Sequence, residues 1–371
     1  YEWLRHEPYD PWWDWAELRG KYDRPRDVAV LNFSSWHDEA YGPEGAVTNF
    51  NGLRAARRGQ RDQKTQLILG PWSHGVPGPE DCKVGQRDFC PAGTIDYDAM
   101  VLDWMDRYVR GIQNGVDRRA PVRYFVMGAN EWREAAEWPL PQAQVTSLYL
   151  HANGKRMDRG DLRREPVTVE ASSTSFVSDP NDPVRDPHPF YSGANDYRAL
   201  ADRSDVLVFD SEPLDRDTEI TGPITAEIYL EVDAPDTDLW VRVLDVAPDG
   251  TAYNLMSPGL DVLRASYANA ALEHHRTGAA GGKRELLQPG TVYKLTLPNL
   301  MTSNVFKKFH RIRVQISATF FPGFSRNLHT GELETVSGKM RTATVRIHHD
   351  KDHPSRILLP LIPPAAPAKQ D

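Results

Sequence analysis

The fold is decided by two stretches of sequence, VAVLNFSSWHD (Val28–Asp38) and QLILGPWSHG (Gln66–Gly75). Each begins with an apolar run of the length of a buried strand and ends in polar residues. A helical pattern over Val47–Arg58 lies between them. Strands that alternate with helices predict parallel pairing and an α/β layer structure.

The same alternation continues on both sides of these stretches. Asp10 followed by Pro11 predicts the start of a helix, because aspartate caps helices and proline suits the first helical position. Asp98–Arg110 has apolar residues three and four positions apart, which predicts a helix that buries one face. Pro121–Gly128 has the composition of a third strand. We therefore expect residues 1–140 to form an α/β unit.

The composition changes near residue 140. Nine of the ten tryptophans lie no further along the chain than Trp138, and the proline-punctuated WPLPQAQ (Trp138–Gln144) is typical of a connection. Beyond it, short strand-like runs separated by turns predict an all-β sandwich or jelly roll over 145–363. The proline- and alanine-rich end, 364–371, is predicted to be loose. The expected strands are 146–152, 205–210, 224–232, 239–246, 293–297, 310–318 and 342–349.

Length and charge exclude several functions. A chain of 371 residues suggests two domains. The net charge of −8 argues against nucleic-acid binding, which needs a basic surface. No apolar run reaches the roughly 18–20 residues of a membrane span. Cys82 and Cys90 are the two cysteines; a single small bridge and two free thiols are both open, and neither fixes the cellular compartment.

Asp38 and His74 follow successive predicted strands. Ligand sites of open α/β sheets lie at the carboxyl ends of strands. An acid followed by a histidine in this arrangement is the second half of a Ser-Asp-His triad, in which the carboxylate orients the histidine that takes the proton from the nucleophile. The alternative is that Asp38 is a cap and His74 a polar loop residue.

The nucleophile of such a triad is not evident. The sequence contains no Gly-x-Ser-x-Gly motif, and the nearest approaches, around Ser73 and Ser325, each lack one glycine. Ser73 also stands next to His74, which gives poor geometry for a Ser–His pair. We therefore expect the nucleophilic serine to lie upstream of Tyr1, and this chain alone to be inactive.

Two other kinds of site were considered. Trp36, Tyr41 and Trp72 lie close to Asp38 and His74 in sequence and are candidates for a substrate pocket, with core packing as the alternative for the tryptophans. The adjacent pairs His274-His275 and His348-His349 are poor metal ligands, because neighbouring residues of a strand point to opposite faces. We therefore predict neither a metal site nor a cofactor.

These motifs resemble those of the cocaine-esterase-like (CocE/NonD) hydrolases, which are related to the Xaa-Pro dipeptidyl-peptidases and α-amino-acid ester hydrolases. The resemblance covers nearly the whole chain. The similar words, in the family's order, are EPYDPWW, SSWHDEAYG, LILGPWSHG, WMDRYVRGIQNGVD, PVRYFVMGANEWR, DVLVFDSEPL, ITGPITAEIYLEVDAPDTDLWVRVLDVAPDG and HRIRVQISATFFPGFSRN.

The resemblance implies a fold and a site. It implies the second half of an α/β-hydrolase domain over 1–140, with the end of a helical cap, followed by a C-terminal jelly-roll β-sandwich. It implies that Asp38 and His74 are the acid and base of the triad. The family's serine and oxyanion-hole residues lie in a part that this chain lacks.

The sequence thus favours a serine hydrolase that cleaves an ester, amide or peptide substrate through an acyl-enzyme. Its partner would be the missing N-terminal half of the catalytic domain, and a homo-oligomer is left open. The alternative is a non-catalytic accessory module in which the β-sandwich binds a ligand and the α/β part is structural.

Overall fold

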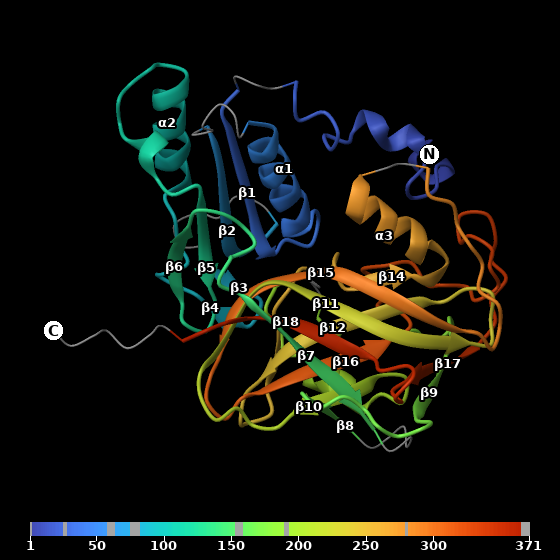
Figure 1. The fold of residues 1–371 in the computed structure, drawn as a ribbon. Helices are drawn as coiled ribbons and strands as arrows, with labels where there is room; N and C mark the ends of the chain where they lie inside the picture. The colour runs from blue at the N-terminus through green and yellow to red at the C-terminus, as the bar shows by residue number, and fades with distance from the viewer. Residues whose placement is uncertain are drawn as a thin grey trace.

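A computed structural model of the chain describes residues 2–24, 28–57, 64–74, 82–152, 159–188, 193–278 and 281–364. Over these residues the structure is mostly β-sheet with few helices (Figure 1). It contains a four-stranded sheet, a twelve-stranded network and a two-stranded hairpin. Within the described part of the chain, no helix is long and apolar enough to span a membrane.

The four-stranded sheet has the order β1-β2-β5-β6. Its strands are β1 (Val30–His37), β2 (Thr65–Ser73), β5 (Val122–Val126) and β6 (Glu131–Ala135). The predicted parallel pairing is confirmed, since β1 pairs with β2 and β2 with β5 in parallel, while β6 is antiparallel to β5. All residues of β2 except the last are buried, as its continuous apolar run predicts for an inner strand.

The helices of this part are shorter or earlier than predicted. Helix α1 (Gly42–Arg57) packs on β1 and β2, and α2 (Tyr97–Tyr108) begins after the capping side chain of Asp96. The helix expected at Asp10 is a short 3₁₀ helix, Pro11–Trp15, and the Asp10 carboxylate accepts the Trp12 amide hydrogen. This cap confirms the predicted start of the helix at Pro11. In α2, by contrast, the second half exposes apolar side chains that were expected to pack against the rest of the protein.

The twelve-stranded network is mostly antiparallel, and each of the seven predicted strands lies in it. Within it, β11 (Thr218–Val232) pairs with three strands, β15, β17 and β18. The remaining strands are β7 (Gln144–His151), β8 (Gly160–Arg163), β9 (Ser173–Ser178), β10 (Leu207–Ser211), β12 (Asp238–Val246), β13 (Ala252–Asn254), β14 (Val262–Arg264), β15 (Val292–Phe306), β16 (Arg311–Ser317), β17 (Ala343–His348) and β18 (Arg356–Ile362).

One helix on this network was not predicted. Helix α3 (Ala268–Thr277) lies over β15 and beside the N-terminal segment (Figure 1). The Arg19 guanidinium donates to the carbonyl oxygen of His274 at 2.6 Å, and the Tyr267 hydroxyl donates to Glu7 at 2.8 Å. These contacts hold the start of the chain against residues more than 250 positions away.

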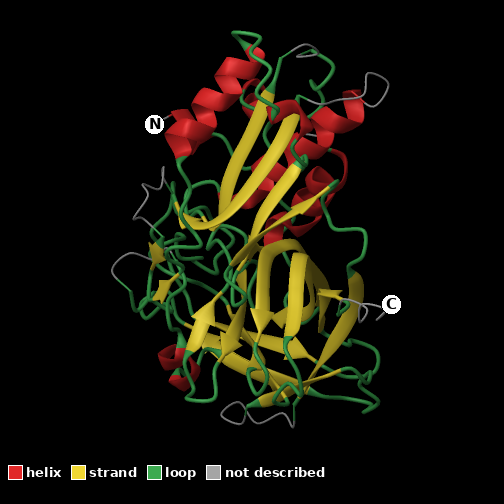
Figure 2. Ribbon diagram, turned by 90° about the vertical axis from the view of Figure 1, so that its left-hand side faces the viewer, coloured by secondary structure: helices red, strands yellow, loops and turns green. Residues whose placement is uncertain are grey.

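The two sheets share a core. Buried side chains from Trp36 to Leu359 form one contiguous hydrophobic cluster. The backbone amide of Met127 donates to Ser303, and that of Val305 donates to Met127, so the end of β5 is hydrogen-bonded to β15. Figure 2 shows most of the helices on the side of the small sheet, which stands on the larger β assembly. A site at the carboxyl end of the small sheet therefore lies next to the β assembly.

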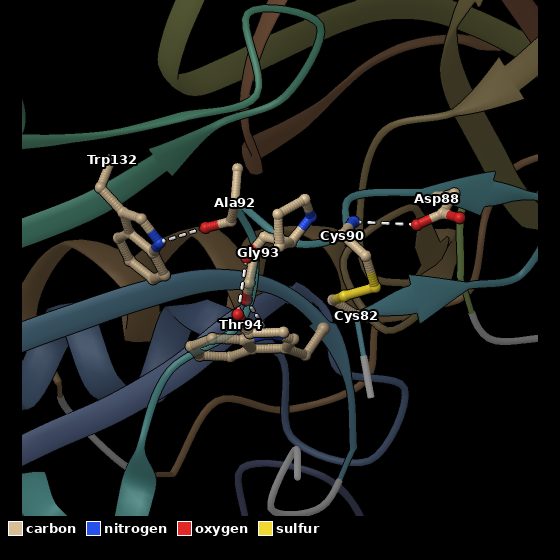
Figure 3. Close-up of a disulfide and its surroundings, with 9 residues drawn as sticks. Cys82, Asp88, Cys90, Ala92, Gly93, Thr94 and Trp132 are labelled. Carbon is tan, nitrogen blue, oxygen red and sulfur yellow. Dashed lines mark hydrogen bonds between the residues drawn. A yellow bond between two sulfur atoms is a disulfide. The ribbon is translucent and has the colours of Figure 1, made fainter. Parts of the chain in front are cut away.

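Cys82 and Cys90 are joined by a disulfide, so the bridged alternative holds in this structure. The bridge closes the hairpin of β3 (Lys83–Val84) and β4 (Arg87–Asp88), as Figure 3 shows. The loop that follows is held by two indoles, since Trp132 donates to the Ala92 carbonyl and Trp72 to the Gly93 carbonyl. Of the predicted loose end 364–371, residues 365–371 lie outside the described residues.

Candidate active site

Asp38 is the residue directly after β1, and the chain turns sharply there. Its Oδ1 accepts the backbone amide hydrogens of Ala40 and Tyr41, both at 3.0 Å. Its backbone carbonyl oxygen accepts from the amide of Gly42, the first residue of α1, which has a φ of 65°. Glycine suits this left-handed conformation, so the sequence Asp-x-x-x-Gly fits a tight passage from strand to helix. The carboxylate is thereby fixed in position and is largely buried.

His74 follows β2, the neighbouring strand, and the structure brings it to Asp38. Its Nδ1 lies 3.1 Å from Oδ1 of Asp38, within the hydrogen-bond distance expected from the sequence. Its backbone amide donates to Oε2 of Glu39 at 3.0 Å. If Nδ1 carries the proton that Asp38 accepts, Nε2 is left as an acceptor. Since 45% of the His74 side chain is exposed, that nitrogen can be approached from outside.

A third residue holds the site from the β assembly. The Ser257 hydroxyl donates to the backbone carbonyl oxygen of Asp38 at 2.5 Å and is fully buried. Ser257 lies after β13, 219 positions from Asp38. Ser257 could not be predicted from the sequence, because nothing in the residues around a loop serine indicates a contact with a residue so far along the chain.

Ser257→Ala should destabilise the fold at this junction. The Asp38 carbonyl oxygen would keep only the longer bond from the Gly42 amide, at 3.2 Å. A buried hydrogen bond of this kind contributes about 1 kcal/mol, so we expect the free energy of unfolding to fall by about that amount in urea titrations. Ser204→Ala, at an exposed serine, is the matched control and should change little. An equal effect in the two variants would contradict a special role for Ser257.

The three candidate pocket residues separate into two groups. Trp36 and Trp72 are 0% and 2% exposed, and their indole N–H groups donate to the carbonyl oxygens of Phe125 and Gly93, both at 2.8 Å. The structure thus places both tryptophans in the core, the alternative that the sequence left open. Tyr41 is 79% exposed, and its ring lies edge-on to the His74 ring at 5.1 Å.

Tyr41 also borders a pocket of about 560 Å³, which neither Asp38 nor His74 lines. The pocket lies among the N-terminal segment, α1, α3 and β15. Glu44 reaches into it from α1; its Oε1 accepts from the Asn299 amide at 2.9 Å and lies 3.6 Å from Nδ1 of His275. These hydrogen bonds hold the pKa of Glu44 below its usual value although burial opposes them. The pocket therefore carries the negative charge of Glu44, and the Tyr41 ring at its border is its contact with His74.

The two serines considered in the sequence are not placed as nucleophiles. Ser73 is the last residue of β2, directly before His74, and the Ser325 hydroxyl donates to Glu334 at an exposed site. Among the described residues, the recorded partners of the His74 ring are Asp38 and Tyr41, and no serine hydroxyl is hydrogen-bonded to it.

His37, immediately before Asp38, is wholly buried, and burial lowers its pKa to about 3. Burial also lowers the pKa of His349 to about 4. Both histidines stay neutral in the folded protein, while in the unfolded chain they take up protons near pH 6.5. The unfolded state then binds more protons, so these groups lower the free energy of unfolding as the pH falls from about 6.5 to about 4.

Replacement of His37 by asparagine tests this pH dependence. Burial raises the pKa of Asp238 to about 6, so below that pH this group increases the free energy of unfolding as the pH falls. Asp238 is present in both the unmodified protein and the variant, so its effect cancels in the comparison. We expect the free energy of unfolding of His37→Asn to fall less steeply with decreasing pH than that of the unmodified protein, by at most about 1.4 kcal/mol per pH unit. Urea unfolding between about pH 7 and pH 4.5 measures it, and parallel curves for the two proteins would contradict it.

Comparisons with known proteins show the family to which the chain belongs. Residues 1–76 match the X-Pro dipeptidyl-peptidase (S15) family, and residues 114–358 match the X-Pro dipeptidyl-peptidase C-terminal non-catalytic domain. Cocaine esterase of Rhodococcus sp. (strain MB1 Bresler) is 33% identical over 311 residues, which are 80% of this chain and 51% of the relative. The chain thus spans about half the length of that relative.

Solved structures share the fold. An aminopeptidase from a Thaumarchaeota archaeon superposes with a TM-score of 0.80 at 22% identity, over 98% of this chain and 60% of the other. An α-amino acid ester hydrolase gives 0.78 at 22% identity, over 97% and 60%. These relatives are hydrolases, which does not favour the accessory-module alternative. The chain therefore belongs to the CocE/NonD (cocaine-esterase-like) family of hydrolases, related to the X-Pro dipeptidyl-peptidases, and it matches the family's C-terminal portion.

Proposed function

We propose that this chain is part of a serine hydrolase that cleaves an ester or amide bond through an acyl-enzyme, with Asp38 and His74 as its acid and base. The observation that carries the proposal is the 3.1 Å contact between His74 Nδ1 and Asp38 Oδ1 at the ends of two neighbouring parallel strands. In this role Nε2 takes the proton of the nucleophile and later gives it to the leaving group.

Asp38 would act through orientation and charge. Its Oδ1 already accepts two backbone amide hydrogens, so the carboxylate cannot easily turn away from the histidine. A carboxylate on Nδ1 fixes the tautomer that leaves Nε2 free, and it stabilises the imidazolium that forms during proton transfer. The Glu39 carboxylate accepts the backbone amide hydrogen of His74 and so holds the same loop at a second point.

The nucleophilic serine would come from a segment outside these 371 residues. Two features support a docking surface for that segment. Strand β1 is at the edge of its sheet, and among the described residues no strand pairs with its outer side. Leu102, Met105 and Val109, at the end of α2 and just beyond it, are 64%, 47% and 70% exposed. A spacing of three and four residues puts them on one face, which further strands or helices of a catalytic domain would cover.

We also propose which domain each half of the chain forms. Residues 1–140 would be the second half of an α/β-hydrolase domain with the end of its cap, and 145–363 a jelly-roll domain. The parallel β1-β2-β5 arrangement supports the first assignment, and the mostly antiparallel network supports the second. The relatives include an esterase, an aminopeptidase and an amino acid ester hydrolase, so we propose small esters, amides or peptides as the substrates.

Labelling with a fluorophosphonate, which reacts with activated serines, tests the proposal. We expect no labelling of the 371-residue chain alone, because none of its described serines is hydrogen-bonded to His74. Joined to the nucleophile-bearing half of a relative's catalytic domain, the protein should label at one serine of that half and hydrolyse a p-nitrophenyl ester. Labelling of Ser73 or Ser325 in this chain would overturn the proposal.

A further inference from the structure

A second group of titratable side chains lies far along the chain, at the turn that joins β17 to β18. His348 is the last residue of β17, and Asp350 and His353 lie in the turn before β18. One ligand atom from each of the three side chains lies within 4.8 Å of those of the others. The proposed hydrolase chemistry uses none of them.

His348 and His349 do point to opposite sides, as expected for neighbours on a strand. His349 is fully buried, and its two ring nitrogens are hydrogen-bonded to the hydroxyls of Ser172 and Thr174 at 2.8 and 2.9 Å. His348 faces the other side, where the turn brings His353 to a ring-centroid distance of 5.3 Å. The partner of His348 is therefore His353, five positions later, and not the adjacent His349.

The carboxylate between the two histidines is held in place. Asp350 is 5% exposed, and its Oδ1 accepts the backbone amide hydrogens of Asp352 and His353 at 3.0 and 2.9 Å. Nδ1 of His353 lies 3.2 Å from Oδ1, and Nδ1 of His348 lies 3.8 Å from Oδ2. In a tetrahedral zinc site with ligand distances near 2.0 Å, neighbouring ligand atoms are about 3.3 Å apart. The separation from His353 is close to that value, and the one from His348, to the other carboxylate oxygen, is about half an ångström longer.

A second carboxylate orients His348 from outside. Its Nε2 lies 3.0 Å from Oε2 of Glu231 on β11, and Arg346 approaches the same oxygen at 3.5 Å. With Nε2 bonded to a carboxylate, Nδ1 of His348 is the nitrogen left to face Asp350. Histidine ligands of metals are commonly oriented in this way by a carboxylate on the other ring nitrogen.

We propose that His348, Asp350 and His353 bind a divalent transition metal of the zinc class, with Glu231 as the outer partner of His348. Two imidazoles and one carboxylate form a three-ligand set suited to zinc, copper or nickel rather than to calcium or magnesium. The His353 side chain is 36% exposed, so a water molecule can complete the coordination. The metal would fasten the turn between β17 and β18 to β11.

Titration with ZnCl₂, followed by calorimetry, and with CoCl₂, followed by visible absorption, tests this site in the protein as purified, without reductant. We expect one tight equivalent, tetrahedral cobalt bands without a thiolate band, and a higher melting temperature with zinc. His348→Gln and His353→Gln should each weaken binding at least tenfold. Asp350→Asn should do the same while keeping the oxygen that caps the turn.

Matched variants separate this site from others. His310→Gln removes a histidine that also contacts a carboxylate, Asp245 at 2.7 Å, and it should leave the metal affinity unchanged. Glu231→Gln should weaken binding by about 10- to 100-fold, as loss of an outer partner does elsewhere. The melting temperature of each metal-free variant shows that it is folded. Undiminished binding in folded His353→Gln and Asp350→Asn, or the absence of a tight equivalent in the unmodified protein, would overturn the proposal.

Discussion

His74→Ala should lower kcat by several orders of magnitude in a protein that joins this chain to the nucleophile-bearing half of the catalytic domain. Without the imidazole, nothing at the ends of β1 and β2 can take the proton from the serine, and removal of one triad member leaves only the catalysis due to binding and the oxyanion hole. The measurement is the steady-state hydrolysis of a p-nitrophenyl ester.

Asp38→Asn is the companion variant and should lower kcat by about 10⁴, because an amide on Nδ1 favours the wrong tautomer. Both side chains are in loops after strands, so the melting temperature should change much less than the rate. Glu39→Gln is the matched control, since it alters a neighbouring carboxylate that accepts from the backbone amide of His74 rather than from its ring. Near-native kcat in His74→Ala, or equal losses in all three variants, would contradict the assignment.

The parts of the fold that were predictable are those that the local sequence determines. The apolar runs that end at Asp38 and His74 are buried strands, and the helical pattern between them implies their parallel pairing. From that pairing, the approach of the two side chains follows directly. The family resemblance was likewise carried by continuous words of sequence, and it is confirmed by the comparisons.

What could not be predicted depends on contacts between distant segments. β18 contains Pro360, which argues against an inner strand, yet it lies between β7 and β11 in the network. Trp36 and Trp72 are near the site in sequence but point into the core, because each indole finds a carbonyl acceptor there. The Ser257 contact and the His348–His353 approach arise only once the strands of the large network are assembled.

The largest expected loss of stability concerns a buried ion pair in that network. Arg242 on β12 and Asp261 are both 0% exposed, and Nε of Arg242 lies 2.7 Å from Oδ2 of Asp261. The guanidinium is surrounded by aromatic rings, with centroids 4.3 Å away at Phe320 and 4.7 Å away at Tyr197. The indole N–H of Trp240 donates to the same carboxylate oxygen at 3.0 Å. Asp261 is therefore the counter-charge of a cation that water does not reach.

Asp261→Ala should reduce the free energy of unfolding by about 3–5 kcal/mol, because it leaves a buried guanidinium without its counter-charge. Arg242→Met combined with Asp261→Leu removes both charges and should cost clearly less than the single change. Glu273→Ala, which breaks the exposed pair with Arg276, is the matched control and should cost less than about 1 kcal/mol. Urea unfolding of the three variants measures these differences. A double variant as unstable as Asp261→Ala would show that the aromatic cage needs the charged pair itself, and that the single loss is not the cost of an unpaired cation.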